Sequence, residues 1–579
     1  MSAILGIDLG TTNSEVALLR DGRPHIIPVD GEPIMPSCVG IDPEGHLLVG
    51  RTAKNQMAAA PEATILSIKR QMGQNVEITL ADRRFSPETI SALILGKLKT
   101  AAEAFLGEPV TEAVITVPAY FDDAQRKATQ NAGTLAGLEV RRIINEPTAA
   151  ALAYDAHTAT DQTVLVYDLG GGTFDASLVV VQSGVVEVKA SHGDTHLGGD
   201  DFDALLMNHA DQHFFDTHGI RLTEDLKARN RLWAAVEKAK RELSDAPFAR
   251  IREEYLLEDH HLDLELSRLD YEEMIRPLLR KTMDCVHRCL KDAAILPGQV
   301  DKVILVGGAS RTPMVAHMVR EAIGCDPQHA IDPDLIVAMG AAIQAGVING
   351  QQTHSVLVDI TPYTFGTSAA GLHAGQWRTD LFVPLIHRGT ALPSRKSEAF
   401  ATMVDGQAAV DVRIHQGEAP FAEDNIFIGN FMVEGLDQEA AAGNEIILTL
   451  ALDLSGMLEV TALEKHTGLS KTVTMQTGEQ GDRFDIAHAR EQLSAMMGAK
   501  APDTGSGEAQ NPSGRPALIA AAKALRKRAV ALIDVIDATD AEELQNLLTD
   551  SQEAIGGGDM DRLARINDSL GDMLFYLED

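Results

Sequence analysis

The sequence predicts an α/β domain of two similar lobes, then an antiparallel β-sandwich and a short C-terminal helical bundle. Two glycine- and threonine-rich turns, each set between apolar runs, occur at domain-sized spacing and predict the duplicated lobes. Short runs of alternating apolar and polar residues over 362–480 predict the sandwich. Apolar residues at helical spacing over 484–579, interrupted by a Gly- and Pro-containing stretch at 498–514, predict the bundle.

The clearest of these turns lies at 167–175, with the sequence Tyr-Asp-Leu-Gly-Gly-Gly-Thr-Phe-Asp. Three consecutive glycines allow backbone N–H groups to converge on an anion. Asp168 and Asp175 add carboxylates that suit a hydrated Mg²⁺. Read alone, the stretch is also compatible with a tight hairpin that carries incidental acids.

The same pattern occurs in residues 4–18, where an apolar run leads into Asp8-Leu-Gly and a hydroxyl-rich turn. Two such hairpins favour a phosphate-binding cleft shared by two lobes. A Walker A motif is absent, which excludes a P-loop. On these motifs the sequence resembles the superfamily of actin, the sugar kinases and the DnaK-type heat-shock chaperones.

Composition narrows the class of protein. The net charge of −34 argues against nucleic-acid partners and an anionic membrane surface, and no apolar run is long enough to span a membrane. The start lacks the features of a signal peptide, so we expect a cytoplasmic protein. Cys285 and Cys289 share a helix face from which His287 points away, which favours free thiols over a metal site.

The resemblance to the DnaK family is densest over 110–155, which includes Glu146 in the motif Asn-Glu-Pro-Thr-Ala-Ala. It implies an α/β actin-like two-lobed ATPase domain (1–354), an interdomain linker (355–361), a peptide-binding β-sandwich (362–480) and a helical lid-like domain (484–579). The implied activity is ATP hydrolysis that allosterically controls binding and release of extended apolar client segments.

The resemblance also implies the site residues, with ATP or ADP, Mg²⁺ and K⁺ as the candidate ligands. Catalytic and metal roles fall on acids, a lysine and a threonine of the cleft, namely Asp8, Lys69, Glu146, Asp168, Thr173 and Asp175. Phosphate contacts are expected from Gly10, Thr11, Thr12, Asn13, Gly170, Gly171, Gly172, Gly198 and Gly199. The adenosine side would use Glu237, Lys240, Arg241, Ser244, Gly307, Gly308, Ser310, Arg311 and Asp334.

For coupling between the domains, the resemblance implies Pro118 and Arg126 as a relay, Leu357 and Asp359 in the linker, and Arg142 as a J-domain contact. The segment Val356–Ile360 is also compatible with a last strand of the second lobe. The implied partners are unfolded or extended client polypeptides and a J-domain co-chaperone. By alignment, the peptide site would be formed by Phe400, Val410 and Val412, with Ala370 and Met403 arching over it; some of these are also compatible with a purely structural core.

Several traits depart from the general housekeeping member of the family. Thr367 places a polar residue in the expected pocket wall, and no Lys or Arg occurs over 434–464 to latch a lid through Asp405. These traits resemble specialised bacterial members such as HscC, and they argue against tight lid closure and use of a GrpE-type exchange factor. The rival interpretations are a small-molecule kinase and an actin-like filament protein, both of which leave 362–579 without a role.

Overall fold

The computed structural model describes residues 3–496 except for gaps at 58, 82, 159–160, 223–224, 330–331, 352–355 and 476–484, together with isolated positions between 529 and 566. The chain divides into two compact units, 1–499 and 500–579. The predicted helix at 484–497 is observed as α10 (Ile486–Met496). The predicted linker at 498–514 lies outside the described residues, and so does nearly all of the predicted terminal bundle.

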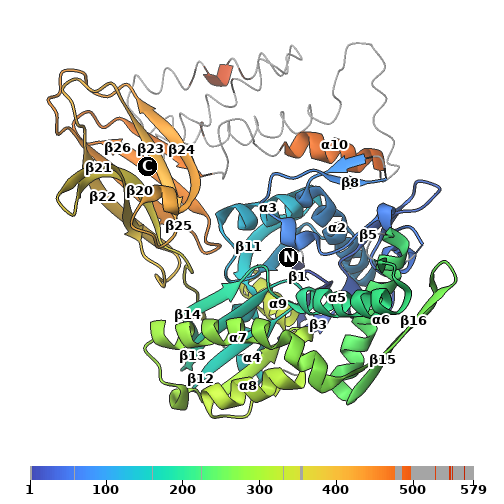
Figure 1. Ribbon diagram of the computed structural model, residues 1–579. Helices are drawn as coiled ribbons and strands as arrows, with labels where there is room; N and C mark the ends of the chain where they lie inside the picture. Colours follow the sequence, from blue (N-terminus) through green and yellow to red (C-terminus); the bar gives the residue numbers. More distant parts are fainter. Residues whose placement is uncertain are drawn as a thin grey trace. The chain divides into compact units, whose positions relative to one another are not determined.

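The first lobe is built on a mixed sheet whose order is β11-β10-β1-β2-β3, with β4 on β2 (Figure 1). β1 runs antiparallel to β2 and parallel to β10, and β10 is parallel to β11. The strands are β1 (Ile4–Leu9), β2 (Asn13–Arg20), β3 (Arg23–Ile26), β4 (Met35–Pro36), β10 (Glu112–Val117) and β11 (Glu139–Asn145).

The second lobe repeats this topology in the order β18-β17-β12-β13-β14, to which the linker strand β19 is added. Again the first strand, β12, is antiparallel to its hairpin partner β13 and parallel to β17. The strands are β12 (Gln162–Leu169), β13 (Phe174–Gln182), β14 (Val185–Asp194), β17 (Lys302–Val306), β18 (Gln328–His329) and β19 (Val356–Val358). The internal repeat that the sequence predicts is therefore present as two sheets of matching topology.

Both faces of each central strand are buried, which explains why these strands are almost continuously apolar. In β12, Leu165, Tyr167 and Leu169 join the core beneath α5, α6 and α7. The alternate residues Val164 and Val166 join a different core, formed with α4 and α9. The helices of this lobe are α4 (Glu146–Thr158), α5 (Gly199–His218), α6 (Leu226–Asp245), α7 (Arg268–Asp292), α8 (Pro313–Ile323) and α9 (Ile336–Ile348).

The core around α4 and α9 takes residues from both sheets and joins the two lobes. The two helices approach closely at Gly340, where an added Cβ would lie 1.8 Å from the carbonyl oxygen of Ala149. On the opposite side of the first sheet, α2 (Pro87–Leu106) and α3 (Asp123–Leu135) cover β1 and β10. The two phosphate-type hairpins are thus held on one rigid base.

Smaller elements decorate the first lobe, and a long hairpin extends the second. They are α1 (Arg51–Gln56), β5 (Val39–Ile41), β6 (Leu47–Val49), β7 (Thr64–Ile65), β8 (Ile78–Leu80), β9 (Arg83–Phe85), β15 (Phe248–Leu257) and β16 (His260–Ser267). The cationic stretch after Pro61 is the short 3₁₀ turn η2 (Ile68–Gln71), where the sequence suggests a helix end. In this turn Lys69 pairs with Glu146, and Arg70 pairs with Asp201.

Residues 365–474 form the predicted antiparallel sandwich. One sheet has the order β21-β20-β23-β24 and the other β22-β25-β26-β27. Alternate residues such as Ile414, Phe431, Leu448 and Val460 fill the space between them. The strands are β20 (Phe365–His373), β21 (Gln376–Ile386), β22 (Ser394–Ala401), β23 (Ala409–Gln416), β24 (Ile426–Glu434), β25 (Glu445–Leu452), β26 (Leu458–Glu464) and β27 (Ser470–Thr474).

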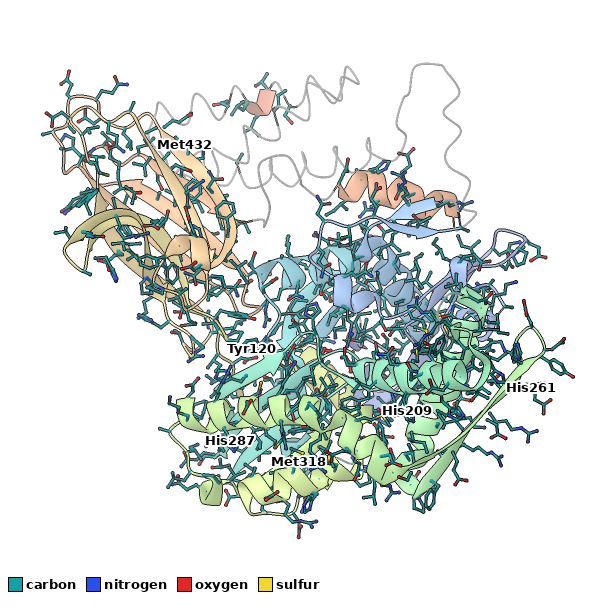
Figure 2. The ribbon with its side chains drawn as sticks, in the orientation of Figure 1. Tyr120, His209, His261, His287, Met318 and Met432 are labelled. Carbon is teal, nitrogen blue, oxygen red and sulfur yellow. The ribbon has the colours of Figure 1, made fainter. Side chains whose placement is uncertain are left out.

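The four cysteines are free thiols, as predicted. Cys289 is buried and its Sγ donates to the carbonyl oxygen of Ala190, whereas His287, labelled on α7 in Figure 2, is exposed. Among the helices of the described ranges, none combines the length and hydropathy that a bilayer crossing needs.

Candidate functional site

The two predicted phosphate hairpins face each other across the lobes. A Cβ added to Gly171 would lie 1.8 Å from Thr12 Oγ1, and one added to Gly172 would lie 2.6 Å from Thr11 Cγ2. Glycine is therefore required at 171 and 172 because the threonines of the other hairpin fill the space. Gly10, Asn13 and Thr173 complete the two turns, and Gly170 N–H donates to the Thr173 carbonyl oxygen at 3.1 Å.

Four acids lie below these turns. Asp8 lies in β1, Asp168 in β12 and Asp175 in β13, and Glu146 begins α4; each is at most 9% exposed. Burial, reinforced by the charge of Glu146, raises the pKa of Asp8 to about 7. Burial also raises the pKa values of Asp168 and Asp175, again with Glu146 as the next cause.

One ammonium group offsets these acids among the described residues. Lys69 Nζ donates to Glu146 Oε1, and Lys69 itself is 4% exposed. Asp8 Oδ1 accepts from Thr116 Oγ1 at 2.8 Å, and Asp175 Oδ2 accepts from the backbone N–H of Ala119 at 3.1 Å. Four buried carboxylates with one ammonium leave an excess of negative charge that would favour a cation.

An independent observation supports the fit of these cleft residues to a phosphate–Mg²⁺ group. Thr12 Oγ1 and Asp175 Oδ1 are among the polar atoms of the cleft that are buried without a hydrogen-bond partner in the described part of the chain. Buried polar atoms are normally satisfied, so unpaired ones in a cleft indicate a ligand position. A hydroxyl matches a phosphate oxygen, and a carboxylate oxygen matches the water shell of Mg²⁺.

The start of α5 is tied to the glycine loop. Gly199 N–H donates to the Gly170 carbonyl oxygen at 2.9 Å, and Asp200 N–H donates to that of Gly171 at 2.8 Å. Gly198 leaves no room for a side chain, since its Cβ would lie 2.4 Å from the Gly171 carbonyl oxygen. The sequence predicted Gly198 and Gly199 in the site, and the structure brings them to it.

The predicted adenosine-side residues of α6 are grouped by ion pairs. Glu237 accepts from Lys54 Nζ at 3.0 Å and from Arg241 at 2.5 Å, so it links α1 of the first lobe to α6 of the second. Lys240 pairs with Asp203 Oδ2 at 2.6 Å and donates to the Gly199 carbonyl oxygen at 3.0 Å. Ser244 lies one turn farther along; its carbonyl oxygen accepts from Arg268.

The third glycine turn, which follows β17, is also present. Gly307 has a φ of 79°, and a Cβ there would lie 2.4 Å from the Leu169 carbonyl oxygen. Ser310 Oγ donates back to the Gly307 carbonyl oxygen at 2.7 Å. Beyond the turn, Arg311 pairs with Asp334 at 2.8 Å, and a Cβ on Gly308 would lie 3.3 Å from Asp334 Oδ1. These five predicted residues therefore form one cluster.

A continuous set of contacts leads from Asp175 to the linker. Ala119, which follows Pro118, donates to Asp175, and its carbonyl oxygen accepts from Arg126 at 3.1 Å. Arg126 also donates to Asn145 Oδ1 at 2.7 Å, and Asn145 Nδ2 donates to Asp359 Oδ2 at 3.0 Å.

The linker occupies the edge of the second sheet. β19 pairs in parallel with β14, and Leu357 lies opposite Val186. The interpretation of this segment as a last strand of the lobe is therefore confirmed, and its role as an interdomain linker stays a prediction. Arg142 lies near Asp359 but is only 7% exposed; burial lowers its pKa, and the charges of Asp359 and Asp453 oppose that shift.

The predicted peptide-site residues lie on both sheets of the sandwich. Val412 is buried in its core, and the half-buried Phe400 and Val410 pack against that core. Ala370 is half-buried on β20, and Met403, at 58% exposed, lies in the loop after β22. The first three thus have a structural role in addition to the predicted one.

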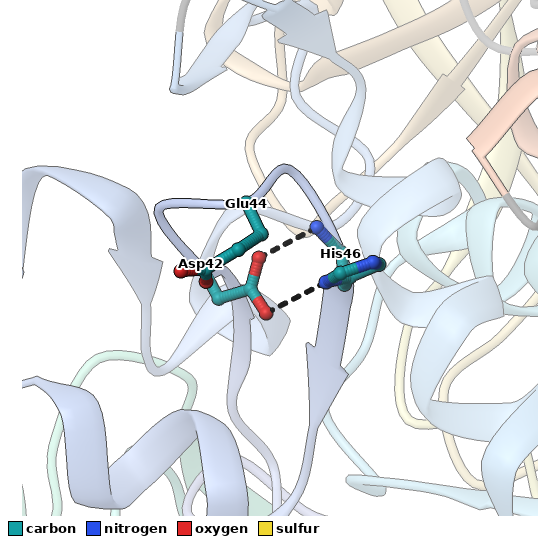
Figure 3. A group of neighbouring side chains, drawn as sticks. All are labelled: Asp42, Glu44 and His46. Atoms are coloured by element: carbon teal, nitrogen blue, oxygen red, sulfur yellow. Dashed lines mark hydrogen bonds and ion pairs between the residues drawn. The ribbon is translucent and has the colours of Figure 1, made fainter.

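A separate group of possible metal ligands, Asp42, Glu44 and His46, lies between β5 and β6 (Figure 3). Asp42 Oδ1 accepts from the His46 backbone N–H at 2.7 Å, and Oδ2 lies 3.0 Å from its ring Nδ1. Asp42 N–H also donates to the His46 carbonyl oxygen. The Asp42 carboxylate is thus engaged in closing a turn, and an exposed acidic turn of this kind carries no metal assignment.

Several residues at the cleft have no counterpart in the sequence predictions. Thr116, Arg70, Asp203 and Lys54 were missed because each meets its partner through the tertiary fold. The adjacency of Arg70 to Lys69 is the one local signal that could have indicated Arg70.

The comparison with protein-family models agrees with the duplicated lobes and the cleft between their glycine turns. The model described as Hsp70 protein matches residues 4–79 and 74–573, which is nearly the whole chain. Members of that family are ATPases that act as chaperones on client polypeptides. The chain belongs to the Hsp70 family.

Proposed function

We propose that this protein is an ATP-dependent chaperone in which hydrolysis in residues 1–354 allosterically controls binding and release of extended apolar peptides by residues 362–480. The observation that carries the proposal is the cleft itself. Two glycine–threonine hairpins converge above four buried carboxylates, and the unpaired buried atoms Thr12 Oγ1 and Asp175 Oδ1 would meet a phosphate–Mg²⁺ group there.

Catalysis would rest on positioning and charge. Thr11, Thr12, Gly10, Asn13 and the loop at 170–172 would hold phosphate oxygens. Bound Mg²⁺ would neutralise phosphate charge, and Asp8, Asp168 and Asp175 would hold it mainly through water. K⁺ is a candidate second cation that would balance the remaining negative charge.

Water would be oriented by the remaining catalytic residues. Lys69 and Glu146 form one buried pair, so each fixes the other's position next to the phosphates. Thr173 would add a hydroxyl from the loop. Because no side chain forms a covalent intermediate in this scheme, we expect slow turnover limited by the positioning of water.

Adenosine would bind between the α6 residues Glu237, Lys240, Arg241 and Ser244 and the turn of Gly307, Gly308 and Ser310, with Arg311 and Asp334 beside it. The planar guanidinium of Arg311 suits stacking on a purine. Its pairing with Asp334 supports this role because it fixes the orientation of that plane.

Coupling would follow the contacts from Asp175 through Ala119, Arg126 and Asn145 to Asp359. Each member is buried and hydrogen-bonded, so a shift at Asp175 has direct contact with the linker. Pro118, which precedes Ala119, would restrict the backbone at the first of these contacts. Sandwich residue Ser455 also joins this region, since its Oγ accepts from the Ile143 backbone N–H at 3.1 Å.

Client segments would bind the sandwich through their backbone and apolar side chains, near Phe400, Val410 and Val412, with Ala370 and Met403 above. We further propose a specialised, HscC-like member with a J-domain partner and no GrpE-type dependence. Asp405 supports the absence of a lid latch, because its Oδ1 accepts from the Ala442 backbone N–H at 2.8 Å. A J-domain contact at Arg142 would require the linker to leave, since that side chain is buried.

The decisive experiment measures ATP hydrolysis with and without an apolar heptapeptide. We expect stimulation by peptide and no phosphorylated product, which separates a chaperone from a small-molecule kinase; absence of ATP-dependent polymerisation separates it from a filament protein. Lys69→Ala should retain ATP binding and lower single-turnover hydrolysis by at least about tenfold. Normal hydrolysis in this variant would show that Lys69 is not a catalytic residue. Lys99→Ala is the matched control, because Lys99 lies on α2.

A further inference from the structure

Helix α7 turns a basic face to solvent over its C-terminal half. Four exposed cations lie there, namely Arg280, Lys281, Arg288 and Lys291. At about 100° per residue, the four fall within a sector of about 100° around the helix axis, so they share one face. His287, labelled on α7 in Figure 2, is exposed beside them. We call the four cations the cationic strip.

The strip is not neutralised by acids of its own helix. In the described part of the chain, none of its four cations forms an ion pair, whereas Arg276 of the same helix pairs with Glu273 at 2.8 Å. Asp284 is the one acid in residues 280–291, so four cations and one acid give this stretch a charge of +3. The whole chain carries −34, and the strip is therefore a local reversal of its sign.

Helix stability does not explain the strip. A cation stabilises a helix C-terminus only within the last turn, where Lys291 lies. Arg280 and Lys281 lie about three turns before the end of the helix. Arg288 and Lys291 are three residues apart, and like charges at this spacing weaken a helix. The strip therefore costs the helix stability, which favours a role in binding an anionic partner.

A guanidinium of the sandwich continues the strip. Arg388, in the loop after β21, pairs with Asp292 Oδ2 at 2.9 Å, and the same oxygen lies 2.6 Å from His192 Nε2. Burial lowers the pKa of His192; Asp292 opposes this shift, and the charges of Arg388 and Arg288 add to it. Both guanidinium groups therefore lie near this histidine, and Asp292 is already engaged by two partners.

We propose that the cationic strip and Arg388 form a docking surface for a short acidic segment of a partner protein. From Arg280 to Lys291 the strip spans about 16 Å, which about five residues of extended chain would cover. Because Arg388 belongs to the sandwich and the strip to the second lobe, a segment that lies across both would link the two domains.

The charge around the strip limits the length of the ligand. Salt screens charges that are more than about 10 Å apart at 0.1 M, so distant acids of this chain do not repel a short segment. A long polyanion would reach the acidic start of α7, where Asp270, Glu272 and Glu273 lie. The surface therefore fits a short acidic peptide better than a nucleic acid or an anionic membrane.

The test measures binding of fluorescein-labelled hexaglutamate to the full chain by fluorescence anisotropy, with hexaglutamine as the neutral counterpart. Three variants change the surface: Arg288→Glu with Lys291→Glu, Arg280→Gln with Lys281→Gln, and Arg388→Gln alone. The matched control is Lys227→Glu with Arg229→Glu, which changes the net charge as much as the first variant and lies on the exposed surface of α6.

We expect hexaglutamate, and not hexaglutamine, to bind wild type, with affinity that falls as salt is added. The Kd should rise at least about tenfold in the Arg288 and Lys291 variant, about threefold in the other two, and less than about twofold in the control. An excess of the apolar heptapeptide should not displace hexaglutamate, since the strip lies outside the sandwich.

The opposite results are equally clear. Failure of hexaglutamate to bind wild type, or equal weakening in the control, would overturn the docking surface. Unchanged binding in Arg388→Gln would overturn its extension onto the sandwich. Tighter binding of an RNA oligonucleotide, or of vesicles that contain anionic lipid, would overturn the short acidic segment as the ligand.

Discussion

Replacing Asp359 by Asn removes one negative charge from a buried position and leaves the shape almost unchanged. The Asn145 side chain and the Ile360 backbone N–H donate to different carboxylate oxygens, at 3.0 and 2.8 Å, so the single oxygen of Asn keeps only one of these two hydrogen bonds. The guanidinium groups of Arg126 and Arg142 lose an opposing charge, however, and both are buried. The variant therefore removes the charge and one acceptor of the carboxylate while its packing is nearly unchanged.

The magnitude follows from two opposing effects. A hydrogen bond to a charged group contributes about 1.5–3 kcal/mol, against about 0.5–1.5 for a neutral one. Removing one partner of a buried ion pair costs about 3–5 kcal/mol. Burial raises the pKa of Asp359, so the wild-type carboxylate is itself costly, which offsets part of that loss. We take about 2 kcal/mol, which shifts the docked-to-undocked ratio of the linker roughly 30-fold.

Hydrogen exchange at the amides of 356–358 measures this ratio directly, because β19 is held by pairing with β14. With Mg-ATP present, we expect exchange there to be about 30-fold faster in Asp359→Asn, while β1 is unaffected, and ATP should no longer trigger peptide release. Asp411→Asn, which removes the charge of an exposed residue of β23, is the control. Unchanged exchange at 356–358 would show that packing, and not this charge, holds the linker.

Three further predictions concern the cleft, the pH response and the lid. Gly171→Ala should abolish nucleotide binding measured by calorimetry while the chain stays folded, because its Cβ would overlap Thr12 Oγ1. Burial lowers the pKa of His192, which pairs with Asp292, so the unfolded state binds more protons than the folded state at low pH. The stability of the fold should therefore fall as the pH drops below about 6.5. The melting temperature of His192→Asn should decline less steeply over the same pH range. Truncation after Met497 should speed release of a labelled heptapeptide less than about tenfold, and a larger effect would show that the lid closes.

The duplicated lobes could be predicted because their signal is local. Each lobe begins with an apolar strand, an Asp-Leu-Gly turn and a second strand, and the structure gives β1–β2 and β12–β13 the same pairing. Period-2 alternation likewise located the sandwich strands. Local sequence left open whether Val356–Ile360 is a linker or a last strand, because three apolar residues form a strand only where a neighbour such as β14 offers a free edge.

The pKa shifts of the site residues could not be predicted from the sequence, for a different reason. Asp8 is one of 84 acidic residues, and nothing in its neighbours along the chain indicates a pKa of about 7. That value arises from burial beneath both lobes and from Glu146, which the fold brings from the start of α4. The ion pair between Arg70 and Asp201 arises in the same way, because its partners belong to different lobes.

Thr367 shows where residue type alone misleads about the peptide site. A threonine in a predicted pocket wall suggests a polar pocket, but this hydroxyl donates to the Arg413 carbonyl oxygen at 2.8 Å and the residue is 4% exposed. The Thr367 hydroxyl is therefore satisfied by a hydrogen bond within the sheet, and the methyl group is the part of the side chain left for an apolar contact. Thr367→Val should accordingly leave the preference for apolar peptides intact in a peptide-array measurement. A shift of preference toward more apolar peptides would show that the hydroxyl faces the client after all.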